Sequence, residues 1–276
     1  MVATRDVILE GRNLHKAFGG LVAVNDVSFG IAPGSVHSII GPNGAGKTTL
    51  MNLVSGVYKP TAGTVIYKGQ DITGLPLHAR AHLGIGRSYQ ITNIFPNLTV
   101  LENVRLAAQA LSKANMRFWT RAMSYREFVD QAMAVIALVG LSDMVMQPAT
   151  NLPHGGKRKL ELAILLAGTP ELLLLDEPTA GVASEQVGEI IRVIEMIRQQ
   201  PNRTVVIVEH NMSLVMNVSD RITVMHLGSV LAEGTPAEIA ANKTVQGAYL
   251  GELYSDVMQS TQTGQSGTTA TGGAHA

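Results

Sequence analysis

Short runs of mostly apolar residues recur along the chain at residues 36–40, 172–175 and 205–208. Runs of this length are typical of strands in a parallel sheet that is covered on both faces. A different pattern occupies residues 7–30, where stretches rich in valine and phenylalanine alternate with turn residues, and residues 63–68 resemble them. This second pattern predicts antiparallel strands. We therefore expect a buried parallel sheet and a separate antiparallel one.

Helical spacing of apolar residues separates these strands. One helix is expected to begin after Thr48 and another near Gln186, where isoleucine and valine residues recur at helical intervals. Strand and helix alternate, which indicates an α/β fold. Residues 91–168 are instead expected to form a helical insertion, introduced by a capping-box pair at Thr99 and Glu102.

The domain organisation follows from these patterns. We expect one domain over residues 1–254, with the helical subdomain of about 91–168 inserted into it. A further capping box, at Thr235 and Glu238, predicts a late helix. Residues 255–276 are expected to form a disordered polar tail, because they consist mainly of small and polar residues that cannot bury enough apolar surface to fold.

Composition and charge narrow the classes of function. Lysine plus arginine and aspartate plus glutamate each total 21, so the overall charge gives no indication of a nucleic-acid partner. Cysteine is absent, which excludes disulfides and thiolate metal sites. The N-terminus lacks the apolar core of a signal peptide and no apolar stretch is long enough to span a bilayer, so we expect a cytoplasmic protein. Attachment to a membrane would require partner subunits.

A glycine-rich loop at residues 41–48 carries the first chemical signal. It matches G-x-x-x-x-G-K-[ST] and lies between a predicted strand and a predicted helix, as a phosphate-binding P-loop does. Backbone N–H groups of such a loop surround the β-phosphate, its lysine reaches the β- and γ-phosphates, and the next hydroxyl binds Mg²⁺. Thr48 is therefore a predicted Mg²⁺ ligand. The predicted ATP-binding residues are Gly41, Pro42, Asn43, Gly44, Ala45, Gly46, Lys47, Thr48 and Thr49.

Two carboxylates follow the predicted strand at residues 172–175. Asp176 and Glu177 occupy the positions of a Walker B pair, in which the aspartate holds Mg²⁺ and the glutamate orients and deprotonates the attacking water. We therefore assign Asp176 as a metal ligand and Glu177 as the general base. These two motifs indicate a P-loop NTPase and leave its reaction open, because kinases, GTPases, helicases and recombinases belong to the same class.

Further motifs, in order between residues 7 and 253, resemble those of ABC-type ATP-binding cassettes. The resemblance implies that Phe18 stacks on adenine, that Gln90 senses Mg²⁺ and the γ-phosphate, and that His210 is the switch histidine at the γ-phosphate. It also implies a P-loop ATPase core with an antiparallel β subdomain and an inserted α-helical subdomain.

The signature motif departs from the family pattern. Pro153 replaces a serine that donates a hydrogen bond to phosphate, so we expect a weaker contact, made through His154, backbone N–H groups and the helix dipole. The loop at residues 180–183 also lacks its common aspartate. The resemblance implies that the following residues contact ATP held by an opposing cassette: Pro153, His154, Gly155 and Gly156.

The resemblance also implies partners and a location. They are a second cassette, identical or not, two transmembrane permease subunits and, through these, a solute-binding protein, at the cytoplasmic face of the inner membrane. Residues 18–24, 98–104, 208–212 and 248–251 are similar to the branched-chain amino-acid uptake branch. Alternatives are another cargo (urea, an amide, an aromatic compound or a lipid), a non-transport ABC ATPase, and a cassette that binds ATP but hydrolyses it poorly.

Overall fold

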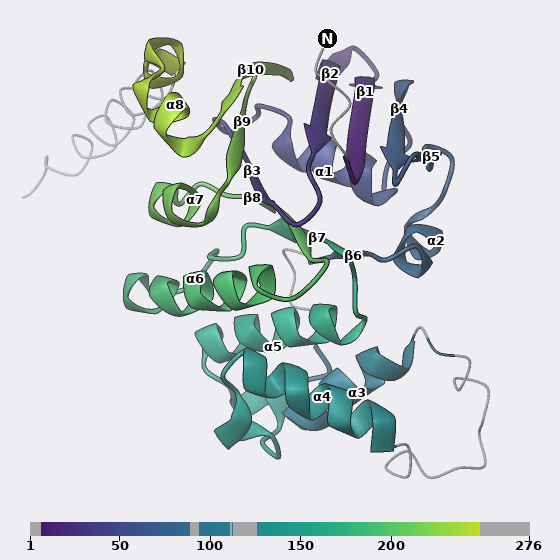
Figure 1. Cartoon of the computed structure of the whole chain (residues 1–276), viewed down its shortest axis with the longest axis vertical. Coiled ribbons are helices and arrows are strands. Elements are labelled where there is room, and N and C mark those ends of the chain that lie inside the picture. The colour runs from purple at the N-terminus through teal and green to yellow at the C-terminus, as the bar shows by residue number, and fades with distance from the viewer. Residues whose placement is uncertain (1–6, 89–93, 111, 113–125, 249–276) are drawn as a thin grey trace, which may run out of the picture.

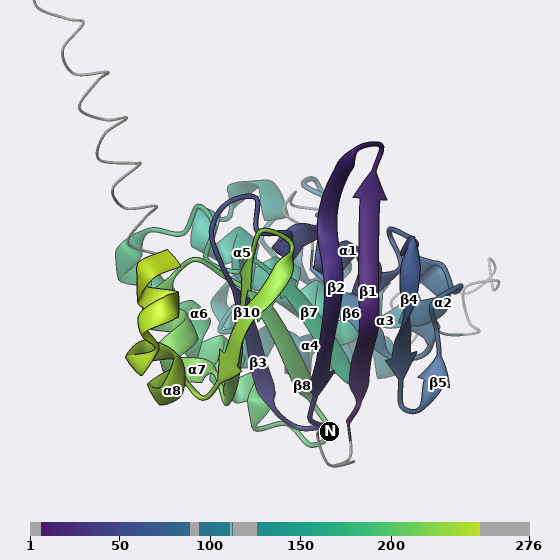
Figure 2. The same ribbon diagram turned by 90° about the horizontal axis from the view of Figure 1, so that it is seen from above.

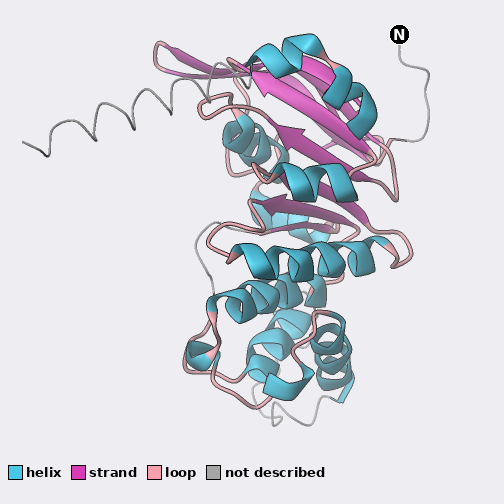
Figure 3. Ribbon diagram, turned by 90° about the vertical axis from the view of Figure 1, so that its left-hand side faces the viewer, coloured by secondary structure: helices cyan, strands magenta, loops and turns pink. Residues whose placement is uncertain are grey.

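The described strands all lie towards one end of the molecule. Figure 1 shows the computed structural model, in which residues 7–88, 94–110, 112 and 126–248 are described. The strands lie in the upper half of this view together with several helices, and the lower half contains helices alone, as the view from the side also shows (Figure 3). Gln90 and the tail at residues 255–276 lie outside the described residues.

The larger sheet contains six of the described strands. They are β3 (Val36–Ile40), β6 (Ile85–Arg87), β7 (Leu172–Asp176), β8 (Thr204–Val208), β9 (Arg221–His226) and β10 (Ser229–Gly234). Their order is β10-β9-β3-β8-β7-β6, and every neighbouring pair is parallel except β9 and β10. The three strands that apolar runs predict, β3, β8 and β7, are buried along their whole length. The prediction of a buried parallel sheet is confirmed.

The smaller sheet is antiparallel. Its strands are β1 (Leu9–Phe18), β2 (Leu21–Ile31), β4 (Ala62–Tyr67) and β5 (Gln70–Asp71), in the order β2-β1-β4-β5. Seen from above, β1 and β2 form the long hairpin at the front of the molecule (Figure 2). The second predicted sheet is therefore also present.

One helix separates the two sheets. It is α1 (Lys47–Ser55), and its buried residues Leu50, Met51 and Leu53 join one hydrophobic core with both sheets. Leu172 and Leu174 of β7 face this core, whereas Leu173 and Leu175 face a second core. That alternation follows from the strand period of two, and it explains why a strand covered on both faces is apolar throughout.

The second core joins the sheet to the helical part. This part contains α3 (Val100–Ala110), α4 (Arg126–Leu138) and α5 (His154–Ala167), and it packs through α5 against the sheet and α6 (Ser184–Arg198). The predicted capping box precedes α3, because Thr99 Oγ1 accepts from the Glu102 N–H at 3.1 Å while the Glu102 carboxylate accepts from the Thr99 N–H at 3.1 Å. Local sequence therefore sets where this helix begins.

The remaining helices are short. They are α2 (Leu77–His82), α7 (Met212–Val218) and α8 (Pro236–Ala241), together with two 3₁₀ turns at Ser142–Met144 and Ala149–Asn151. The capping box predicted at Thr235 and Glu238 is present at the start of α8. No helix in the described part of the chain is long and apolar enough to cross a membrane.

Two polar residues of β3 are buried among apolar neighbours. His37 Nε2 lies 2.8 Å from Thr223 Oγ1 in β9, and Ser38 Oγ lies 2.6 Å from Ser219 Oγ. Burial and, to a smaller extent, the nearby charge of Arg221 together lower the pKa of His37 to about 4. His37 is therefore neutral at pH 7, and its hydrogen bond offsets part of the cost of removing it from water.

Candidate active site

One edge of the larger sheet carries the glycine-rich loop, Asp176, Glu177 and His210. β3, β8 and β7 are neighbours and run parallel, so the loops that follow them emerge at the same edge. The glycine-rich loop follows β3, His210 follows β8, and Glu177 follows β7. In open α/β sheets the carboxyl ends of parallel strands are where ligands bind. The topology therefore brings together chemistry that is spread over most of the chain.

Glycines shape the phosphate loop because larger residues do not fit it. Gly41 and Gly46 have φ angles of 150° and 97°, in a region that L side chains rarely adopt. A Cβ atom at Gly41 would lie 2.2 Å from the Met225 carbonyl oxygen, and one at Gly46 would lie 2.3 Å from that of Ala23. Both distances are far below van der Waals contact, so the backbone here requires glycine.

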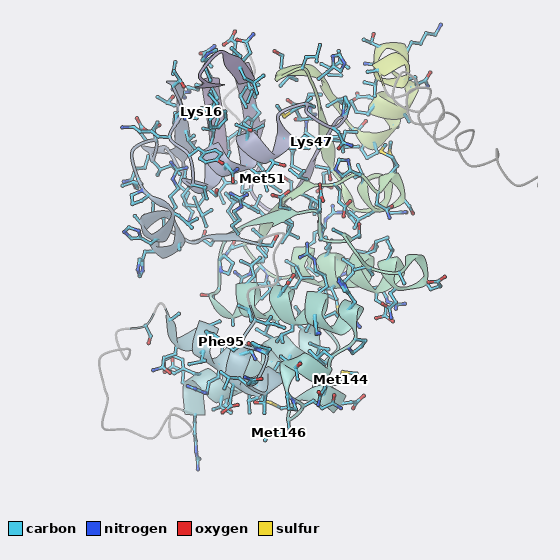
Figure 4. All side chains as sticks on the ribbon, turned by 180° about the vertical axis from the view of Figure 1, so that it is seen from behind. Lys16, Lys47, Met51, Phe95, Met144 and Met146 are labelled. Carbon is cyan, nitrogen blue, oxygen red and sulfur yellow. The ribbon has the colours of Figure 1, made fainter. Side chains whose placement is uncertain are left out.

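The start of α1 offers donors to an anion. Its N-cap is Gly46, which has no side chain to make a capping hydrogen bond, and its first turn, which the structure describes in full, contains no acidic residue. Lys47 Nζ donates to the carbonyl oxygens of Gly41 at 2.6 Å and Pro42 at 2.8 Å. Thr48 is exposed beside it. Figure 4 shows Lys47 among the strands, at the opposite end of the molecule from Phe95 and Met146.

Asp176 is buried at the end of β7. Its Oδ2 lies 3.3 Å from Arg87 Nη2, and among the described residues its buried Oδ1 has no hydrogen-bond partner. Burial raises the pKa of its carboxyl above the ordinary value, and the charge of Arg87 opposes that rise. An unpartnered carboxylate oxygen is a ligand that Mg²⁺ accepts, so Asp176 fits the predicted metal role. Gln90, the other predicted ligand in this region, lies outside the described residues.

Glu177 adopts an uncommon backbone conformation. Its φ is 48°, in the left-handed region, although it is not a glycine, and its N–H donates to the Val208 carbonyl at 2.8 Å. This turn directs its side chain to the loop after β8, where Oε1 lies 2.9 Å from His210 Nε2. The two predicted catalytic residues, 33 positions apart, are therefore in direct contact.

A buried carboxylate, Glu209, supports this pair, and sequence patterns did not indicate it. Glu209 Oε1 accepts from the N–H and the hydroxyl of Thr179, while Oε2 accepts from the N–H groups of His210 and Asn211 at 2.8 and 3.0 Å. Its side chain is 3% exposed. Glu209 thus ties the loop after β7 to the loop after β8.

Phe18 lies beside a second aromatic residue. Its ring makes an edge contact with Tyr58 at 5.3 Å between centroids, and Lys16 Nζ lies 5.0 Å from its centroid. Phe18 is 43% exposed, so part of its surface is accessible to a flat ligand. Tyr58 and Lys16 were not predicted as site residues, because Tyr58 comes after α1 and no local motif marks either residue.

The signature residues begin α5. Pro153 is its N-cap, and both Pro153 and His154 are exposed, whereas Gly155 and Gly156 are buried. The His154 ring packs on Gly181, where a Cβ atom would lie 2.8 Å from its Cε1. The two regions that depart from the family pattern, residues 153–154 and 180–183, are therefore neighbours in the folded chain.

Comparisons with known proteins agree with this geometry. The family model for the ABC transporter matches residues 24–180, more than half of the chain. The chain belongs to the ABC transporter family. Its fold is the α/β P-loop cassette fold, and members of this family hydrolyse ATP to power transport. A second family model, for the branched-chain amino acid ATP-binding cassette transporter, matches residues 229–254.

Two curated relatives cover nearly the whole cassette. The chain is 40% identical to the high-affinity branched-chain amino acid transport ATP-binding protein LivG of Escherichia coli over 89% of this chain and 98% of LivG. It is 37% identical to the lipopolysaccharide export system ATP-binding protein LptB of the same organism over 89% of this chain and 98% of LptB.

Solved structures of ABC cassettes share the fold. The ADP conformation of the cassette MJ1267 superimposes with a TM-score of 0.78 at 30% identity, covering 90% of this chain and 100% of that one. The dimeric post-hydrolysis state of the cassette MJ0796, bound to ADP and Pi, gives 0.71 at 26% identity, over 83% of this chain and 98% of that one. The cassette fold with its nucleotide-binding edge is therefore the fold of this chain.

Proposed function

We propose that this chain is the ATP-hydrolysing motor of an importer of branched-chain or related hydrophobic amino acids. The contact between Glu177 and His210 beside the glycine-rich loop is the observation that carries the hydrolytic part of this proposal. The match of residues 229–254 to a branched-chain amino-acid cassette model supports the cargo. The chain is 40% identical to LivG and 37% identical to LptB, although the two relatives serve different cargoes. Sequence identity over the whole chain therefore discriminates poorly between cargoes.

In the proposed reaction, water attacks the γ-phosphorus of ATP and the bond to the β-phosphate oxygen breaks. Glu177 takes the proton of that water, and His210 hydrogen-bonds the γ-phosphate and orients Glu177. Lys47 moves from the carbonyl oxygens of Gly41 and Pro42 to the β- and γ-phosphates, because two anionic oxygens attract its charge more strongly than two neutral carbonyls.

Mg²⁺ would be held by Thr48, Asp176 and Gln90, together with phosphate oxygens. It would neutralise charge on the phosphates.

Replacing Asp176 with asparagine should raise the Mg²⁺ concentration that half-maximal ATP binding requires by about tenfold or more, since an amide oxygen is a weaker ligand than a carboxylate. Fluorescent ATP titrated with Mg²⁺ measures this, and Asp143→Asn, on a surface turn, is the matched control. An unchanged Mg²⁺ dependence would contradict the metal role.

The signature residues support a dimer of cassettes. Pro153 and His154 are exposed at the start of a 14-residue helix, α5, whose N-terminal dipole favours an anion. We propose that they face ATP bound to a second cassette, with Phe18 of that cassette stacked on the adenine. The dimeric structure of the MJ0796 cassette supports such an arrangement.

A groove of about 480 Å³ supports docking to permease subunits. It lies between α2, β6 and α5, and Leu77, Ile164 and Leu165 contribute apolar surface to it. Two of its polar residues contact the end of β7: the Ser88 hydroxyl accepts from the Asp176 N–H at 2.9 Å, and Arg87 pairs with the Asp176 carboxylate. A permease helix docked here, at the cytoplasmic face of the plasma membrane, would therefore contact residues next to the hydrolytic site.

Cargo-dependent ATP turnover tests the importer proposal. The cassette is assembled in membranes with its permeases, and candidate amino acids are supplied through the solute-binding protein. Turnover should rise with leucine, isoleucine or valine and remain basal with urea, amides and aromatic acids. Stimulation by one of the latter, and none by the amino acids, would contradict the cargo while leaving the motor intact.

A further inference from the structure

Arg158 differs from the two lysines beside it in the chain. Its side chain is 7% exposed, although it lies in the first turns of α5 on an otherwise hydrophilic stretch. Arg158 comes three positions after Gly155 and four before Leu162, both buried, so helical geometry places all three on one face. That face packs towards the end of β7.

The guanidinium of Arg158 contacts the turn that carries Glu177. Its Nη2 donates to the carbonyl oxygens of Asp176 at 3.0 Å and Glu177 at 2.6 Å, and its Nε donates to that of Pro178 at 2.9 Å. These are three consecutive carbonyls. The planar guanidinium binds them from two nitrogens and keeps a third for Glu161, whereas a lysine ammonium carries all its donors on one atom.

Glu161 holds the guanidinium in this orientation. Its Oε2 accepts from Arg158 Nη1 at 2.5 Å, one helical turn away, and its side chain is 10% exposed. The pair compensates a charge that would otherwise be buried among neutral carbonyls. Glu161 also lines the groove between α2 and α5. The orientation of Arg158 therefore depends on a second residue that is accessible from that groove.

We infer that Arg158 is a positioning residue for Glu177 and that Glu161 positions Arg158. Glu177 needs such support because its left-handed conformation, at a φ of 48°, is disfavoured for a residue with a side chain. In that conformation its carboxylate lies 2.9 Å from His210 Nε2. The inference depends on the proposed role of Glu177 as the base. It adds that α5, the helix of the signature motif, holds the catalytic turn of its own chain.

Kinetics of Arg158 variants test this inference. Arg158→Met removes every donor, and Arg158→Lys keeps a positive charge but places all its donors on one nitrogen, which cannot reproduce the spread of the guanidinium contacts. Both should lower kcat by about tenfold or more with the ATP dissociation constant within about twofold of wild type, because the phosphate loop is untouched. Glu161→Gln should give a smaller fall of about threefold. The control is Lys159→Met on the same helix as Arg158, which removes an ion pair to Glu189 of α6 and should leave kcat within about twofold.

A double variant separates positioning from a general effect on stability. If Arg158 acts through Glu177, then Glu177→Gln with Arg158→Met should hydrolyse ATP in single turnover no more than about twofold slower than Glu177→Gln alone. Losses that multiply would overturn the inference. So would a wild-type kcat in Arg158→Lys, the variant best able to fold. Wild-type turnover in Glu177→Gln would contradict both this inference and the proposed base. If Glu177→Gln loses turnover but Arg158→Met keeps the wild-type rate, only the inference is contradicted.

Discussion

Replacing Glu209 with glutamine should weaken both the fold and the hydrolytic site. The Glu209 carboxylate accepts four hydrogen bonds, two from Thr179 and one each from the N–H groups of His210 and Asn211. Glutamine has the same shape and only one acceptor oxygen. The NH₂ group of the glutamine is best placed facing Thr179, because the Thr179 hydroxyl can rotate to accept a hydrogen bond from it. The Thr179 N–H then faces this NH₂ group, a second donor, and is left without an acceptor.

The structure sets the size of this effect. One buried donor left unsatisfied costs about 1–3 kcal/mol, and the two bonds that remain lose the strength that a charged acceptor gives. We therefore expect the free energy of unfolding to fall by about 2–4 kcal/mol. Because the turn after Glu177 loses an anchor and the bond from the His210 N–H is weakened, kcat should fall by about tenfold as well.

Urea denaturation followed by circular dichroism measures the first effect, and ATP turnover below the denaturation range measures the second. Glu195→Gln is the matched control, since Glu195 is exposed on α6. Surface substitutions of this kind change stability by at most about 0.5 kcal/mol. A Glu209→Gln protein as stable as this control would refute the reasoning that the four contacts anchor the loops.

Three further predictions follow from single positions. Gly46→Ala should weaken ATP binding by about tenfold or more, because the new Cβ would meet a carbonyl oxygen at 2.3 Å, while Gly188→Ala on α6 should leave binding unchanged; fluorescent-ATP titration measures both. His37 has a folded-state pKa of about 4 against an ordinary 6.5, so only the unfolded state takes up its proton as pH falls through this range, and stability should drop by roughly 3 kcal/mol. His37→Gln should lack that part of the pH dependence in denaturant titrations at pH 7 and pH 4.5. Pro153→Ser should raise ATP turnover by restoring a phosphate donor, and no change or a fall would contradict the proposed weakness of this signature.

Motifs that are contiguous in the chain were predictable, because their chemistry and their local structure coincide. The loop at residues 41–48 needs positive φ angles, a helix start and a lysine, and all three are visible in eight adjacent residues. The strand before Asp176 was predictable because burial on both faces demands a continuous apolar run. Capping boxes before α3 and α8 were predictable for a similar reason, since both partners lie within one helical turn.

Residues that support the site from a distance gave no such signal. Arg158 appears in the sequence as one of three adjacent basic residues, and only the rotation of α5 distinguishes the one that contacts residues 176–178. Arg87 ends a three-residue strand, β6, that is too short to show a period. The hairpin of β9 and β10 was missed because its turn, at Leu227 and Gly228, has positive φ at both positions without the asparagine or aspartate that usually marks one.

ATP turnover by wild type and by Glu177→Gln, measured beside ATP binding, tests the central claim most directly. If Glu177 is the base at a working hydrolytic site, the variant should bind ATP within about twofold of wild type, and its turnover should fall by about 100-fold or more, the range that general-base catalysis supplies. Glu195→Gln should match wild type in both assays. Turnover in Glu177→Gln close to that of wild type would contradict the assignment of Glu177. A wild-type protein that binds ATP and never hydrolyses it, even with permeases and cargo present, would contradict the motor itself.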